Sequence, residues 1–188
     1  MYCNMRDQIA DYLKDLTISN RKELFEVLNF IAPLVGCWSL TEPRSVRQIM
    51  RYASAKARKS AYVDFSIPKK SGGQRTISAP VKPLKALQST INILLQSIFV
   101  PDDHATGFVL DRSIKDNALI HVGQTCIFNT DLENFFPSIT KLMVRKALHR
   151  ELAGKLPSKD VINIICSLCT VPNSSGIEVL PQGAPTSP

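Results

Sequence analysis

Residues 62–80 read YVDFSIPKKSGGQRTISAP, and this stretch decides the fold of the chain. Apolar and polar side chains alternate over Tyr62–Ile67 and again over Arg75–Ala79, which is the period of a β-strand. Ser71-Gly72-Gly73 between the two runs is a turn signal, and Pro80 closes the second run. We therefore predict a β-hairpin. Three basic side chains would surround its tip: Lys69, Lys70 and Arg75.

Helical periodicity surrounds the hairpin on both sides. Apolar residues recur at intervals of three and four, which predicts amphipathic helices over residues 5–16, 20–33, 43–53, 84–98, 113–121, 140–152 and 158–170. Residues 125–131 are instead typical of a buried strand that ends in an acid. These elements predict an α+β fold in three parts: residues 1–60, residues 61–124 and residues 125–188.

Composition excludes several classes of protein. The chain has 188 residues, of which 44% are hydrophobic and 21% charged, so it can bury a core and is neither disordered nor collagen-like. No apolar run approaches the roughly 18–20 residues of a membrane helix, and the first residues lack a signal-peptide core. Five cysteines, an odd number, favour free thiols in a reducing compartment. We therefore expect a cytoplasmic protein without membrane association.

The net charge of +7, from 23 basic and 16 acidic residues, is concentrated in one stretch. Residues 44–85 hold eleven Lys and Arg side chains against Asp64 alone, beside three aromatic residues. Such a block attracts phosphates, and aromatic rings can stack on bases, although a solvated surface is the plainer interpretation. We favour nucleic-acid or nucleotide binding, with Arg44, Arg47 and Arg51 as candidate RNA contacts.

Two further motifs carry potential chemistry. Asp131 follows the apolar run, and a carboxylate in that position can hold a divalent metal with help from a backbone carbonyl such as that of Leu132. Phe136, five residues later, either packs in the core or floors a nucleotide pocket. Leu180-Pro181-Gln182-Gly183 is either a simple turn or a loop that places Gln182 beside a nucleotide.

In this order, the hairpin, the acid and the final loop resemble the reverse transcriptase family over about residues 62–188. The resemblance implies a right-hand polymerase with N-terminal helices, fingers that carry the hairpin, and an incomplete palm. It implies that Lys69, Lys70 and Arg75 bind the incoming deoxynucleoside triphosphate. Asp131 and the Leu132 carbonyl would hold Mg²⁺ in a two-metal site.

The same resemblance assigns two further roles in nucleotide binding. Phe136 would discriminate against the ribose 2′-hydroxyl, and Gln182 would lie near the nucleotide. Glu133 is a competing candidate acid beside Asp131, although we expect its side chain to project differently.

A narrower resemblance connects the chain to bacterial retron reverse transcriptases. Asn117-Ala118-Leu119-Ile120-His121 matches the Asn-Ala-x-x-His signature of that group, and residues 182–188 fit the same group. The resemblance implies that Asn117 and His121 contact RNA, and that a structured RNA serves as template and primer for cDNA in defence against phage. It leaves any effector protein unspecified. Group II intron and abortive-infection reverse transcriptases remain alternatives.

One family motif has no counterpart in this sequence. An aromatic-x-Asp-Asp turn does not occur after Asp131, and Ser187-Pro188 is typical of a helix start. We therefore expect a truncated chain that is inactive in polymerisation by itself, with a non-catalytic RNA-binding remnant as the alternative. Cys166 and Cys169 lie in an apolar helical pattern, so we interpret them as buried thiols and not as a zinc site.

Overall fold

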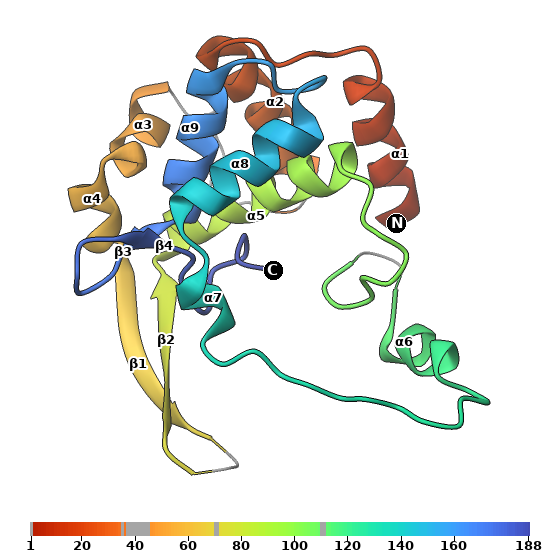
Figure 1. Cartoon of the computed structure of the whole chain (residues 1–188). Helices are drawn as coiled ribbons and strands as arrows, with labels where there is room; N and C mark the ends of the chain where they lie inside the picture. Colours follow the sequence, from red (N-terminus) through yellow and green to blue (C-terminus); the bar gives the residue numbers. More distant parts are fainter. Residues whose placement is uncertain (1, 35, 37–45, 70–71, 110–111) are drawn as a thin grey trace.

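The computed structural model of the chain describes residues 2–34, 36, 46–69, 72–109 and 112–188. Its helices gather into one body, from which a β-hairpin and a helix-bearing loop extend (Figure 1). The elements are α1 Tyr2–Leu13, α2 Arg21–Leu34, α3 Val46–Ala53, α4 Ala55–Lys59, β1 Tyr62–Pro68, β2 Gln74–Pro80, α5 Lys82–Ile98, α6 Ile114–Ile120, α7 Phe135–Ser138, α8 Lys141–Leu152, α9 Lys159–Cys169, β3 Val171–Pro172 and β4 Glu178–Val179. This mixture of helices with small sheets fits the predicted α+β class.

The core is formed by the apolar faces of α1, α2, α5 and α9, with Leu152 and Leu156 from the end of α8 and the turn after it. Each buried Leu or Ile side chain contributes about 1.5–3 kcal/mol by leaving water, so these faces hold the helices together. The helices predicted over residues 140–152 and 158–170 are present as α8 and α9, and each begins with a side-chain cap. Thr140 accepts a hydrogen bond from the Met143 N–H in α8, and Ser158 accepts one from Val161 in α9.

The predicted hairpin is confirmed. β1 and β2 pair antiparallel from Tyr62 opposite Pro80 to Pro68 opposite Gln74. Gly72 and Gly73 have φ values of 88° and 82° at the tip, a conformation that glycine adopts without steric penalty. The far half of the hairpin stands away from the helical body (Figure 1), and Phe65 and Ile67 are 49% and 39% exposed.

The predicted strand over residues 125–131 is wrong. These residues adopt no regular secondary structure and are exposed, with Phe128 at 88% and Ile127 at 60%. The segment runs as an extended connection from α6 to α7 (Figure 1). A strand needs neighbours that satisfy its backbone N–H and C=O groups, and no described residue pairs with this segment as a strand.

The sequence did not predict the small sheet that β3 and β4 form. β3 and β4 pair through Val171 opposite Val179. Thr140 forms an isolated bridge to Val179, and the Leu180 N–H donates to the Ile139 carbonyl at 3.0 Å. These contacts fix the junction of α7 and α8 to the segment that leads into the Leu180–Gly183 loop.

Arg58 corrects the interpretation of residues 44–85 as a uniformly exposed basic block. Its side chain is buried, donates to the Thr170 carbonyl at 2.8 Å and forms an ion pair with Glu178. Lys141 binds the other carboxylate oxygen of Glu178 at 2.6 Å. Arg58 therefore connects α4 to the β3–β4 sheet and is not available to a nucleic acid.

No helix in the described part of the chain has the length and apolarity needed to cross a membrane.

Cys166 and Cys169 are buried free thiols, as predicted. Burial raises the pKa of Cys166 to about 11 and that of Cys169 to about 12, so both thiols stay protonated at neutral pH. The first residues of the helix predicted over residues 43–53 lie outside the described residues.

Candidate functional site

A cavity of about 490 Å³ opens between the hairpin and the start of α7, and we call it the hairpin cavity. It brings together residues from three distant parts of the sequence. Its lining consists of Lys69, Gln74, Arg75, Thr76, Asp131, Leu132, Glu133, Asn134, Phe135, Phe136, Pro137 and Gln182. Six of the site residues predicted from the sequence are in this set: Lys69, Arg75, Asp131, Leu132, Phe136 and Gln182.

The hairpin contributes the positive side of the cavity. Lys69 follows β1 directly, and its N–H donates to the Gly73 carbonyl at 3.0 Å, which closes the turn. Arg75 lies on β2 opposite Ile67. Both side chains are exposed, so one ammonium and one guanidinium face a site that is open to solvent. Lysine acts on phosphate as a point charge, whereas arginine binds it as a planar fork.

The segment before α7 contributes the negative side. Asp131 and Glu133 both line the cavity and are exposed, so the cavity holds two carboxylates. Asn134 then adopts a left-handed conformation with φ of 51°, which asparagine tolerates better than most residues, and turns the chain into α7. This turn directs Phe136 toward the cavity.

Phe136 serves the cavity and the core together. Its ring is half-buried against the core cluster and makes an edge-to-face contact with Phe135, with 5.5 Å between ring centroids. Of the two alternatives that the sequence left open for Phe136, packing against the core is confirmed, and the residue also lines the hairpin cavity. A ring held in this way presents a fixed apolar surface to a ligand.

The Leu180–Gly183 loop closes the cavity against the hairpin. The Ser78 N–H in β2 donates to the Gln182 carbonyl at 2.8 Å. Gly183 has φ of 121°, and a Cβ there would lie 2.8 Å from the Ile77 Cγ2 atom. The loop is therefore packed directly on β2, which explains why a residue without a side chain follows Gln182. No sequence signal identified Ser78, because its partner is chosen by the tertiary fold.

The described residues of the hairpin cavity supply some of the oxygen ligands that a metal ion needs, but not a full set. Among the described residues, no three His, Cys, Asp or Glu side chains gather closely enough to hold a metal ion. The hairpin cavity offers the carboxylates of Asp131 and Glu133 and the backbone carbonyls beside them. Oxygen ligands of this kind suit Mg²⁺, but they do not by themselves make a two-metal site.

Among the predicted RNA contacts whose side chains the structure describes, Asn117, His121 and Arg51 do not line the hairpin cavity. Asn117 is exposed in α6 and His121 is exposed at the C-terminal end of that helix. Arg51 is exposed in α3, which also contains Arg47. Arg44 and Lys70 lie outside the described residues.

Comparisons with known proteins give the sequence relationship of the chain. No family model matches it. It is 40% identical over 139 residues to the retron Mx65 reverse transcriptase of Myxococcus xanthus, which covers 68% of this chain and 32% of that protein. It is 37% identical over 131 residues to the retron Ec86 reverse transcriptase of Escherichia coli, which covers 68% of this chain and 38% of that protein.

The retron Ec83 reverse transcriptase of Escherichia coli is 34% identical over 128 residues, covering 68% of this chain and 41% of that protein. The chain thus spans about a third of the length of the relatives it matches. The resemblance seen in the motifs is confirmed: over two-thirds of its length, this chain is a relative of the bacterial retron reverse transcriptases.

Proposed function

We propose that the chain provides the nucleotide site and part of the RNA surface of an RNA-directed DNA polymerase of the retron type. One observation carries the proposal. Side chains from the hairpin, the segment before α7 and the Leu180–Gly183 loop all line the hairpin cavity. In this proposal the hairpin belongs to the fingers and the residues from Asp131 onward belong to the palm. The polymerase would copy a structured RNA into cDNA in the bacterial cytoplasm, in defence against phage.

The charges of the hairpin cavity suit a deoxynucleoside triphosphate. Lys69 and Arg75 would bind the phosphates from one side, where an ammonium and a guanidinium offset the charge of the phosphate chain. Gln182 would contact the nucleotide from the loop that is fixed to Ser78. The cavity, at about 490 Å³, falls within the range of small-molecule sites.

The acidic side suits a divalent cation bound together with the triphosphate. Asp131 would hold Mg²⁺ through its carboxylate, and Leu132 would add its backbone carbonyl. The bound ion would supply charge neutralisation to the reacting phosphates. The remaining ligands would be phosphate oxygens, water and groups outside the described residues.

Phe136 would set the choice of sugar. Its ring is held by the core on one side, so it cannot move away from a ligand without disturbing that packing. A 2′-hydroxyl placed against this ring would clash or lose its hydration, whereas a 2′-deoxyribose would not. We therefore propose that Phe136 favours deoxynucleotides.

Titration of a fluorescent deoxyadenosine triphosphate into the chain, with Mg²⁺ present, tests this assignment. The double variant Lys69→Gln with Arg75→Gln should weaken binding about 10- to 100-fold, since hydrogen bonds to charged groups contribute about 1.5–3 kcal/mol. The matched control is Lys82→Gln with Lys85→Gln, two exposed residues of α5 that do not line the cavity. Equal binding by both double variants would contradict the nucleotide site and favour a non-catalytic RNA-binding protein.

A further inference from the structure

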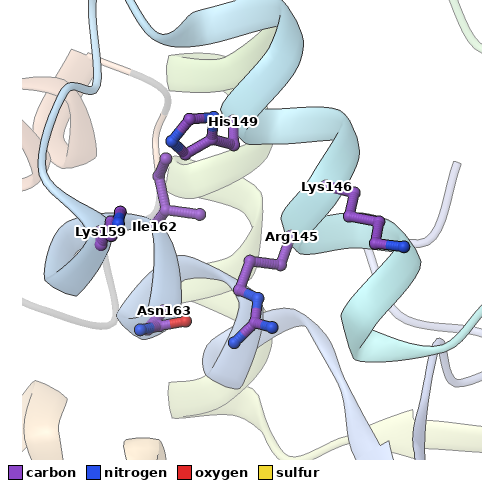
Figure 2. Close-up of a pocket in the computed structure, with 6 residues that line it drawn as sticks. All are labelled: Arg145, Lys146, His149, Lys159, Ile162 and Asn163. Carbon is purple, nitrogen blue, oxygen red and sulfur yellow. The ribbon is translucent and has the colours of Figure 1, made fainter.

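A second cavity, of about 350 Å³, lies between α8 and α9 and shares no lining residue with the hairpin cavity. We call it the α8/α9 groove. Figure 2 shows the residues that line it: Arg145, Lys146, His149, Lys159, Ile162 and Asn163. None of the six is acidic.

The geometry of the α8/α9 groove places polar groups above an apolar floor. Ile162 is 1% exposed, whereas the side chains around it are open to solvent. Figure 2 shows Arg145 and Asn163 extending into the space between the two helices from opposite sides, with the His149 ring beside Ile162. Arg145 and His149 are one turn apart on α8, and Lys159 and Asn163 are one turn apart on α9.

The cations of the groove lack acidic partners within the described part of the chain. The side chains of Arg145, Lys146 and Lys159 form no ion pair with an acidic side chain that the structure describes. Their neighbours do: Arg150 pairs with Glu151 at 2.5 Å, and Asp160 pairs with Arg21 at 2.6 Å. Arg145, Lys146 and Lys159 thus line one cavity without an acidic side chain in its lining. Like charges that line one groove repel, so an anion bound between them would stabilise it.

We propose that the α8/α9 groove binds a backbone phosphate of RNA. The guanidinium of Arg145, the ammonium of Lys159 and the amide of Asn163 are donors that suit phosphate oxygens. No aromatic ring lines the groove beyond the His149 imidazole, so a phosphate fits it better than a stacked base. The choice of RNA as the source of the phosphate rests on the proposed function.

The test measures binding of a structured RNA hairpin to the whole chain at increasing salt concentrations. The variant Arg145→Gln with Lys159→Gln should weaken binding several-fold in low salt. It should also make the dependence of log affinity on log salt shallower, by about 0.7 for each phosphate contact that is lost. Asn163→Asp, which keeps the shape and adds a carboxylate, should weaken binding without removing a cation.

The matched control is Lys22→Gln with Arg150→Gln, which also removes two positive charges but from exposed side chains already paired with Glu26 and Glu151. Circular dichroism and urea unfolding establish that each variant is folded. The inference is overturned if the groove variants and the control give the same affinity and the same salt slope. It is also overturned if inorganic phosphate alone perturbs the Asn163 amide as strongly as RNA at equal concentration, since that outcome means a site for free anions.

Failure of this inference can be distinguished from failure of the proposed function. Nucleotide titration reports on the hairpin cavity, and the groove variants should leave it unchanged. If the groove variants make the dependence of log RNA affinity on log salt shallower, the inference is supported even if the chain binds no nucleotide. A chain that binds nucleotide through Lys69 and Arg75, but keeps its RNA affinity in the groove variants, contradicts the inference alone.

Discussion

The N–H of Ser78, in the hairpin, donates a hydrogen bond of 2.8 Å to the carbonyl of Gln182, in the last loop of the chain. This bond fixes the position of the loop relative to Lys69 and Arg75, which lie farther along the same hairpin. Without this contact, the loop that carries Gln182 would move more freely relative to the hairpin that carries Lys69 and Arg75. The bond therefore makes the hairpin cavity a preformed site, which reduces the entropy lost when a ligand binds.

Gly183→Ala should damage the hairpin cavity through the loop. The added Cβ would lie 2.8 Å from the Ile77 Cγ2 atom and 3.3 Å from the Ser78 carbonyl oxygen, and φ is 121°. We expect the free energy of unfolding to fall by about 1–3 kcal/mol and nucleotide affinity to fall with it. Urea unfolding and nucleotide titration measure the two effects.

Gly107→Ala is the control for this variant, because a Cβ at Gly107 meets no atom within 4 Å. It should leave stability and nucleotide affinity close to those of the unmodified chain. Equal effects at the two positions would show that the contact between the loop and β2 does not organise the cavity.

Arg58→Met should be strongly destabilising. The substitution removes the partner of Glu178 and leaves the buried Thr170 carbonyl without its hydrogen bond. Breaking a buried ion pair on one side costs about 3–5 kcal/mol, although Lys141 still binds Glu178 and should hold the loss near the lower value. Thermal unfolding compared with Lys59→Met, an exposed neighbour, checks this expectation. Similar melting temperatures for the two variants would mean that the contacts of Arg58 contribute little to stability.

The buried thiols should make stability depend on alkaline pH. Burial raises the pKa of Cys166 to about 11, whereas an unfolded thiol has an ordinary value near 9. Above pH ~9 the unfolded chain therefore loses a proton that the folded chain retains, so the contribution of this group to stability falls as pH rises toward 11. Below pH ~9 the contribution is fully present.

Urea unfolding of the unmodified chain and of Cys166→Ala, from about pH 8 to 11, isolates this effect. The stability advantage of the unmodified chain over the variant should shrink as pH rises. A difference that stays constant across this interval would mean that Cys166 is not shielded from water in the native protein.

The basic stretch that includes Arg44, Arg47 and Arg51 should bind RNA mainly through phosphates. Substituting glutamine for Arg44, Arg47 and Arg51 together should weaken binding to unrelated RNA sequences by similar factors, because phosphate contacts carry no sequence information. The slope of log affinity against log salt should also become shallower, by about 0.7 for each lost contact on single strands. Anisotropy titrations with two RNAs of different sequence measure both effects. A change confined to one RNA would indicate base recognition instead.

Local patterns were sufficient to predict most elements. The amphipathic period predicted α8 and α9, and alternation around Ser71-Gly72-Gly73 predicted the hairpin. The strand predicted over residues 125–131 failed because an apolar run becomes a strand only where another strand offers its backbone. β3 and β4, with two residues each, are too short to leave a periodic signal.

The sequence motifs predicted part of the candidate site. They did not predict the contacts that depend on tertiary packing. The motifs located Lys69, Asp131 and Gln182, which the fold brings to one cavity. Arg58 was misread as a surface cation because its partner Glu178 is distant in the sequence. The α8/α9 groove was missed because residues 95–188 hold 8 basic and 9 acidic side chains, so the total hides a local excess.

Asp131 offers the most direct test of the central claim, that the hairpin cavity is the nucleotide site of a polymerase. Asp131→Asn keeps the size of the side chain and removes its charge, and Glu133→Gln makes the same change at the second carboxylate of the cavity. Both are introduced into a complete retron-type polymerase that carries this sequence, and primer extension on an RNA template is measured beside RNA binding.

We expect Asp131→Asn to lose nearly all primer extension while RNA binding persists, and Glu133→Gln to retain most of its activity. Extension by Asp131→Asn at the rate of the unmodified enzyme would contradict the account. An equal loss in Glu133→Gln would mean that Asp131 is not the sole essential acid of the cavity.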